Sequence, residues 1–159
     1  MIAVRVRAPY LSPMPAFADI VADFAFLDEW DDRYKYLIDL GRSLPPYPEV
    51  KRDEAHKVRG CASQVWFDPR IEARGDRRVL ALSGDSDAHI VKGLVALLFA
   101  LYADKTPAEI LAVDARGALE PLDLSAHLTP QRSNGLFSMI KRINDIAAAN
   151  RDESVARSP

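Results

Sequence analysis

Cys61 is the residue of this chain whose type and neighbours best suit chemistry. It is the single cysteine among 159 residues, it follows Gly60, and two cations, Lys57 and Arg59, come shortly before it. Nearby cations favour the thiolate, which is the nucleophilic form of cysteine, and a glycine lets a second molecule approach the sulfur closely. A lone cysteine is also common as a small buried apolar side chain. From the residues alone, a reactive thiol and a buried thiol are therefore equal alternatives.

The cysteine and histidine counts exclude several kinds of site. One cysteine cannot form an intramolecular disulfide framework, and one cysteine with three histidines cannot assemble the usual structural zinc site. An iron–sulfur scaffold is excluded as well, because cluster ligation requires several thiolates. We therefore expect no metal site in this chain.

The three histidines, His56, His89 and His127, provide an alternative chemistry for Cys61. A cysteine-dependent hydrolase or transferase needs a histidine base within hydrogen-bond reach of its thiol. His56 precedes the cysteine closely, His89 begins an expected helix, and His127 lies in an expected loop. Scattered surface or helix-cap histidines are the competing interpretation. The signatures HExxH, GxSxG, the P-loop and GxGxxG do not occur in the sequence.

The elements that must position Cys61 follow from hydrophobic periodicity and turn residues. Residues 64–73 and about 77–82 are typical of two strands, and Arg74-Gly75-Asp76 of the hairpin turn between them. Helical spacing of apolar residues covers 15–24, 28–40, 90–103, 106–113, and a segment from within Thr129–Gly135 to about Asn150. The predicted class is α+β, with one small antiparallel β-sheet packed against several α-helices.

Three details of this prediction concern the ends of elements. Gly41 is expected to end the second helix, at a position where a left-handed residue is favoured. Residues 83–87 are expected to form a loop that ends in N-cap residues. Residues 114–128 are expected to be a loop that leads to the last helix. One domain thus spans residues 15–150, between an N-terminal extension, 1–14, and a polar tail, 151–159, for which we expect disorder.

The overall composition narrows the class of protein. A chain with 48% hydrophobic residues can bury a core, and 21 basic against 23 acidic residues leave no excess of cations for binding nucleic acid. No apolar stretch reaches the roughly 18–20 residues that a membrane-spanning helix needs. The N-terminus also lacks the apolar core of a secretory signal. We therefore expect a cytoplasmic protein in a reducing compartment.

Several motifs together resemble one family. The segment Val58–Trp66, which contains Cys61, is similar to the reactive-cysteine motif of the SufE family, the sulfur acceptors that serve cysteine desulfurases. Further blocks resemble the same family in the same order: Trp30–Gly41 followed by Leu44-Pro45, Gly84–Leu94, and His127–Leu136. The resemblance covers about residues 15–150 and implies a SufE/IscU-like fold.

The resemblance implies a sulfur carrier, an accessory protein rather than a stand-alone enzyme. Cys61 would take persulfide sulfur from a desulfurase that depends on pyridoxal phosphate (PLP), stimulate that enzyme, and deliver the sulfur towards iron–sulfur cluster assembly. The implied partner is a SufS- or CsdA-like desulfurase, because SufE-type and CsdE-type acceptors share these motifs. PLP belongs to that partner, so no cofactor is expected in this chain. An iron–sulfur scaffold or another sulfur recipient would follow downstream.

The family pattern also extends to residues around the thiol. Arg132 matches the arginine of a Thr-Pro-x-Arg-Ser block and would bind an acidic partner surface or anionic sulfur; an exposed cation at a helix start is the alternative. Asp87 matches an aspartate that lies near the reactive cysteine in the family, and it would also make a good N-cap. Gln64 and Trp66 would shape a pocket or interface, and Arg59 would favour the thiolate.

Overall fold

A long β-hairpin is the element that carries the predicted site. The computed structural model describes residues 15–58 and 63–156, with side chains to residue 151. In it, β1 (Val65–Arg74) pairs antiparallel with β2 (Arg77–Ser86) from Val65 opposite Ser86 to Arg74 opposite Arg77. Gly75 makes the turn with a φ of 65°, a conformation that glycine adopts without strain.

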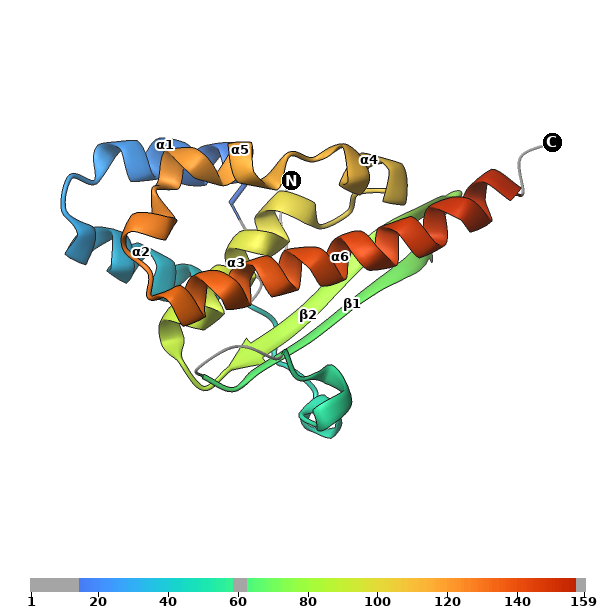
Figure 1. Cartoon of the computed structure of the whole chain (residues 1–159), viewed down its shortest axis with the longest axis horizontal. Coiled ribbons are helices and arrows are strands. Elements are labelled where there is room, and N and C mark those ends of the chain that lie inside the picture. Colours follow the sequence, from blue (N-terminus) through green and yellow to red (C-terminus); the bar gives the residue numbers. More distant parts are fainter. Residues whose placement is uncertain (1–14, 59–62, 157–159) are drawn as a thin grey trace, which may run out of the picture.

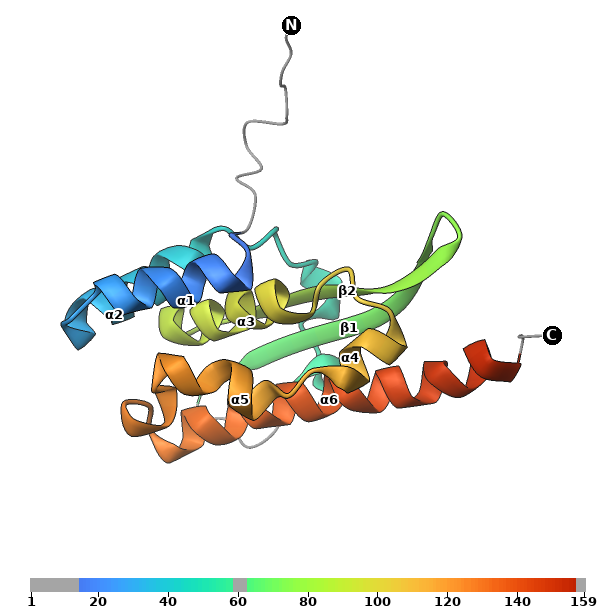
Figure 2. The same ribbon diagram turned by 90° about the horizontal axis from the view of Figure 1, so that it is seen from above.

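Helices pack against this hairpin, which confirms the α+β class (Figure 1). Helix α3 (His89–Tyr102) contacts β2, and the longer helix α6 (Pro130–Ala156) contacts β1. Figure 2 shows the hairpin extending alongside both helices. The remaining helices are α1 (Phe17–Phe26), α2 (Trp30–Arg42), α4 (Pro107–Ala112), α5 (Ala115–Leu119) and the short 3-10 helices η1 (Glu49–Lys51), η2 (Glu54–His56), η3 (Glu120–Leu122) and η4 (Leu124–Ala126).

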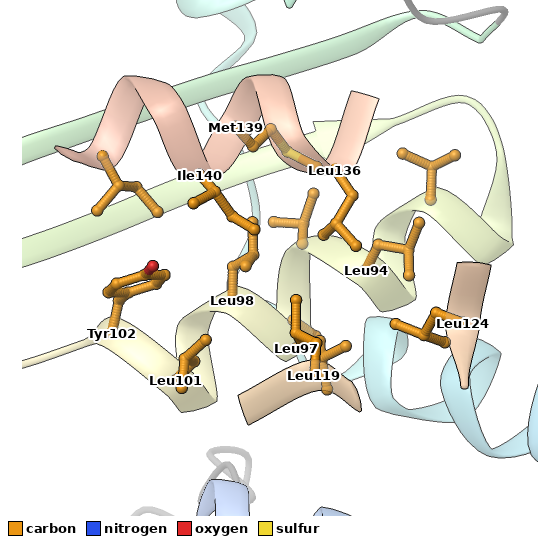
Figure 3. Packing of buried hydrophobic residues seen from close by; sticks show 14 of the residues in the cluster. Leu94, Leu97, Leu98, Leu101, Tyr102, Leu119, Leu124, Leu136, Met139 and Ile140 are labelled. Carbon is orange, nitrogen blue, oxygen red and sulfur yellow. The ribbon is translucent and has the colours of Figure 1, made fainter. Parts of the chain in front are cut away.

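The core is centred on α3. This helix is apolar nearly all round, so it can be buried on most of its faces. Figure 3 shows its leucines meeting side chains from α6 and from the chain around α5 and η4, among them Leu119, Leu124, Leu136 and Ile140. Each such side chain contributes roughly 1.5–3 kcal/mol when it is removed from water. The helix that begins just after the predicted site therefore rests on a rigid core.

Gly41 does not end α2, contrary to the sequence-based expectation. The helix continues to Arg42, and Gly41 is a buried helical residue. A Cβ atom on Gly41 would lie 2.7 Å from the backbone nitrogen of Gly93 in α3, and one on Gly93 would overlap the carbonyl of Leu37. The two glycines therefore allow α2 and α3 to pack backbone against backbone.

The predicted loop at residues 83–87 is also wrong, because β2 continues to Ser86. Gly84 pairs with Phe67, and a Cβ atom there would lie 3.0 Å from Cγ1 of Val95. Small residues are needed here because the strand passes close to α3. In sequence they look the same as the small residues of a loop.

The structure differs from two further expectations in the C-terminal third of the chain. The expected loop at 114–128 contains α5, η3 and η4. The last helix begins at Pro130 and continues to Ala156, past the expected end near Asn150 and into the tail that was expected to be disordered. No proline or glycine interrupts residues 136–158, so the sequence contains no strong stop signal there. Within residues 15–58 and 63–156, no helix is both long and apolar enough to cross a membrane.

Candidate functional site

The predicted site centres on Cys61, which lies outside the described residues together with Arg59. The structure does describe the chain on both sides of this four-residue interval, as far as Val58 before it and from Ser63 after it. The site can therefore be built from the two segments that lead into and out of residues 59–62.

The outgoing segment is held at Gln64 by the end of β2. The backbone N–H of Gln64 donates to Oδ1 of Asp87 at 3.1 Å, and the backbone N–H of Asp87 donates back to the Gln64 carbonyl at 3.2 Å. The hydroxyl of Ser86 donates to the same carbonyl at 2.7 Å. Gln64 and Asp87, which the sequence placed in one site, are thus in direct contact, and Ser86 joins them although sequence reasoning missed it.

Asp87 is not the N-cap of the following helix. The N-cap of α3 is Ala88, which has no side-chain cap bond, and the Asp87 carboxylate faces Gln64 instead. Ser86 accepts from the backbone N–H of Ala88 at 3.1 Å. The acceptor role of Asp87 is therefore directed at the segment after Cys61, and the helix-cap interpretation is wrong.

The incoming segment is paired with the start of β1. The backbone N–H of Val58 donates to the carbonyl of Val65 at 2.8 Å, and Lys57 forms an antiparallel bridge with Trp66. The side chain of Val58 is 5% exposed and belongs to the core. Both described ends of the interval that contains Cys61 are thus attached to β1 and β2.

Arg142 on α6 adds a contact that sequence reasoning did not find. Its guanidinium donates to the carbonyls of Lys57 at 3.1 Å, Phe67 at 3.2 Å and His56 at 3.4 Å. The only signal in the sequence is a cation directly before the buried Ile143, on a helix that buries one face. A cation at such a position must find acceptors, because leaving it unpaired and desolvated is costly.

Trp66 lies in a charged cluster beside the start of β1. The guanidinium of Arg52 lies 5.3 Å from the Trp66 ring centroid and forms an ion pair with Asp85 at 2.5 Å. Lys92 lies 3.5 Å from the other Asp85 oxygen. A cavity of about 230 Å³ opens beside this cluster and is lined in part by Tyr47 and Arg52. Trp66 itself is half-buried.

Tyr47 contributes a neutral hydroxyl next to the same cluster. Burial, reinforced by the charges of Asp68 and Asp53, raises the pKa of Tyr47 to about 12. Its hydroxyl donates to the carbonyl of Lys51 at 3.1 Å. The group therefore stays protonated at physiological pH and acts as a hydrogen-bond donor within the structure.

Arg132 lies on the first turn of α6 and is half-buried. Its backbone N–H donates to Oγ1 of Thr129 at 3.2 Å, which is a typical N-terminal helix contact. Within the described part of the chain no residue pairs with its guanidinium, and the structure does not join it to Gln64, Asp87 or Trp66. Its side chain is thus available to a group outside the described contacts.

Two of the three histidines proposed as a base for Cys61 contact described side chains. Nδ1 of His56 lies 2.7 Å from Asp53, and Nε2 lies 4.0 Å from the buried Asp68. This hydrogen bond from His56 holds the pKa of Asp53 below its usual range. His127 stacks on Trp30, with ring centroids 3.9 Å apart. His56 and His127 thus each have a described partner, while their distances to Cys61 lie outside the described residues.

His89 is the exposed first residue of α3.

Over the described ranges, no group of three histidine, cysteine, aspartate or glutamate side chains is arranged to hold a metal ion. A larger cavity of about 510 Å³ lies between η3, η4 and the start of α6, lined by residues such as Leu124, Ser133 and Phe137. It contains none of the described residues that the sequence assigned to the site.

The fold is shared with a solved structure. A hypothetical protein from Thermus thermophilus, whose solution structure is known, matches with a TM-score of 0.64 and 21% identity. The match covers 84% of this chain and 93% of that one. A likeness at this level of identity establishes a small α+β fold of the same kind.

The sequence comparisons establish the family. The model of the SufE family, described as an Fe-S metabolism associated domain, matches residues 18–147. An uncharacterized SufE-like protein of Rhizobium meliloti (strain 1021) is 48% identical over 134 residues, which is 84% of this chain and 96% of the relative. A SufE-like protein of Rhizobium etli, also uncharacterized, is 47% identical over 84% of this chain and 90% of its own length. The chain belongs to the SufE family.

Proposed function

We propose that this protein accepts sulfur from a PLP-dependent cysteine desulfurase of the SufS or CsdA type and carries it on Cys61. The observation that carries the proposal is membership of the SufE family over a region that includes Cys61. The attachment of the chain on both sides of residues 59–62 supports it, because it links a single thiol to a rigid hairpin. The sulfur would then pass towards iron–sulfur cluster assembly, and the protein would act in the cytoplasm as an accessory protein.

The transfer step is an exchange between sulfur atoms. The thiolate of Cys61 attacks the outer sulfur of the persulfide on the desulfurase, a bond forms between Sγ and that sulfur, and the donor's S–S bond breaks. The donor cysteine leaves as a thiolate, and the proton of the donor persulfide stays on the transferred sulfur. No net oxidation or reduction occurs, so the step needs neither a metal nor a second cysteine.

Each residue that the sequence assigned to the site has a role in this sulfur transfer. Asp87 and Gln64 hold the segment after the thiol, and Arg59 favours the thiolate. Trp66 contributes to the surface that meets the desulfurase, and Arg132 provides a cation for an acidic partner surface or for anionic sulfur. The free guanidinium of Arg132 within the described contacts is consistent with such a role.

The first prediction concerns Cys61 itself. After incubation with a SufS-type desulfurase and cysteine, the wild-type protein should gain one sulfur atom, and reductant should remove it. It should also raise the rate at which the desulfurase consumes cysteine. Cys61→Ser should do neither, because an alkoxide is not available at neutral pH. Intact-protein mass spectrometry and a sulfide assay measure the two effects, and equal stimulation by Cys61→Ser would refute the carrier role.

A histidine-free variant separates this function from a cysteine hydrolase or transferase. A carrier needs no base on its own chain, so replacing His56, His89 and His127 by glutamine should leave sulfur uptake within about twofold of wild type. A hydrolase would lose its base in the same variant. Unchanged unfolding curves by circular dichroism serve as the control for folding.

A further inference from the structure

Arg142 uses one side chain to bind three backbone carbonyls from two separate segments. Two of these carbonyls, of His56 and Lys57, belong to residues 56–58, which we call the entry segment because it leads into the interval containing Cys61. The third, of Phe67, belongs to β1. The guanidinium therefore joins the entry segment, β1 and α6 at one point.

The N–H groups of the entry segment are already bound elsewhere. His56 donates its backbone N–H to the Asp53 carboxylate at 3.0 Å, Lys57 donates to the Glu54 carbonyl at 3.3 Å, and Val58 donates to the Val65 carbonyl. The carbonyls of His56 and Lys57 need donors from another direction, and Arg142 supplies them. Without it, polar groups in a half-buried place would lose their partner, which is costly.

Arginine is suited to this task in a way that lysine is not. Its planar guanidinium presents several N–H donors in a fixed fork, so it can serve two adjacent carbonyls and a third at the same time. No carboxylate in the described part of the chain forms an ion pair with Arg142, so carbonyl dipoles are the groups that compensate its charge there. A lysine ammonium would keep the charge but could not reach all three oxygens with the same geometry.

We infer that Arg142 is a positioning residue for sulfur transfer: it fixes the entry segment against α6 and β1, and so sets the point from which Cys61 is presented. This inference rests on the proposed function. Asp87 and Ser86 hold the chain after the interval at Gln64, and Arg142 holds it before the interval at Lys57. The chain between these two held points includes Cys61, and misplacement of a reacting group by about 1 Å can cost about 100-fold in rate.

The test compares Arg142→Met with Lys141→Met in the full-length chain. Lys141 is the neighbouring cation on α6, it is exposed, and its ion pair is with Asp145 on the same helix. Arg142→Met should lower the rate of sulfur transfer at saturating carrier by about 10-fold or more, with little change in the half-saturating concentration, because the docking surface is untouched. Lys141→Met should stay within about twofold of wild type.

A second readout does not require a desulfurase. Hydrogen exchange of the Lys57 and Val58 amides should be faster in Arg142→Met than in wild type and in Lys141→Met. Arg142→Lys should restore at most part of the transfer rate and of the protection. If Arg142→Met does not fold, as judged by its unfolding curve, Arg142→Lys alone should still show reduced transfer and faster exchange at Lys57 and Val58.

The outcomes separate this inference from the proposed function. Wild-type transfer by Arg142→Met, or equal losses in Arg142→Met and Lys141→Met, would overturn the positioning role while leaving the carrier role intact. Unchanged exchange at Lys57 and Val58 would also overturn it. If the wild-type protein accepts no sulfur, the proposed function fails, but faster exchange confined to Arg142→Met would still show that Arg142 holds the entry segment.

Discussion

The Asp87 carboxylate acts on the backbone of another strand rather than on its own helix. It accepts the N–H of Gln64, three residues after Cys61, and its own N–H returns a bond to the same residue. This exchange resembles one rung of an antiparallel ladder in which a side chain replaces a backbone acceptor. Asp87 thus continues the hairpin by one step beyond β2.

Replacing Asp87 tests this acceptor role. Asp87→Ala removes the acceptor and should cost about 1 kcal/mol of stability and slow sulfur transfer. Asp87→Asn keeps an oxygen in the same position and should retain most of both. Urea unfolding and the transfer assay measure the two effects. If the asparagine variant loses as much as the alanine variant, the negative charge rather than the hydrogen bond is what matters, and if neither variant differs from wild type, the acceptor role is refuted.

The site could be predicted from the sequence only where its residues carry a recognisable pattern. Cys61, Gln64 and Asp87 belong to motifs; the latter two are in contact in the structure, and the site role of all three stays a prediction. Ser86 and Arg142 were missed because both bind backbone carbonyls. Carbonyls are present at every position, so such partners depend on how α6 and β2 pack and leave no trace in local spacing.

The close contact between α2 and α3 depends on Gly41 and Gly93, so enlarging either glycine should destabilise the fold. Gly93→Ala places a methyl group against the carbonyl of Leu37, where no flexible side chain can yield. We expect a loss of about 1–3 kcal/mol in the free energy of unfolding. At an ordinary helical position the same change would stabilise by up to about 1 kcal/mol. Urea unfolding followed by circular dichroism therefore shows whether Gly93→Ala lowers or raises the free energy of unfolding.

The elements were predicted well where periodicity defines them. The first strand and α3 lie where apolar spacing indicated, and α4 lies within the expected helix at 106–113, where Thr106 and Glu109 form a capping box. Errors occurred at Gly41 and at residues 83–86. A glycine at a close helix contact and a glycine at a helix end are identical in sequence, and the difference arises only when a second element approaches.

Two tyrosines, the half-buried Tyr36 and the buried Tyr47, give the molecule as a whole a predictable response to alkaline pH. Burial, with the hydrogen bond to Asp23, raises the pKa of Tyr36, and the pKa of Tyr47 is raised to about 12. In the unfolded chain both would titrate near pH 10. The folded state thus binds these protons more tightly, and the stability they contribute is complete below about pH 10 and is lost as the pH rises towards about 12.

The measurement is the free energy of unfolding near neutral pH and at about pH 11, for wild type and for Tyr36→Phe/Tyr47→Phe. The double variant should be less stable near neutral pH, since it loses two hydrogen bonds, but its stability should decline less between the two conditions. Lysines titrate in the same range in both proteins, so the difference between the proteins isolates the tyrosines. If the free energy of unfolding falls equally in both proteins, the raised pKa values of Tyr36 and Tyr47 do not contribute to stability.

At the scale of the molecule, the α+β class followed from the order and type of the elements, but their arrangement did not. Nothing in the spacing of residues 130–150 shows that α6 lies on β1 rather than on another face. That contact depends on the combined shape of α3, the hairpin and α6, whose side chains meet in the core.

The unbroken length of α6 has a consequence for how this chain can change. Arg132 and Arg142 are ten residues apart on one helix, a distance of roughly 15 Å along its axis. Inserting or deleting a single residue between them would turn one arginine by about 100° relative to the other. The helix thus fixes the spacing between the two arginines, and residues added beyond Asn150 leave that spacing unchanged.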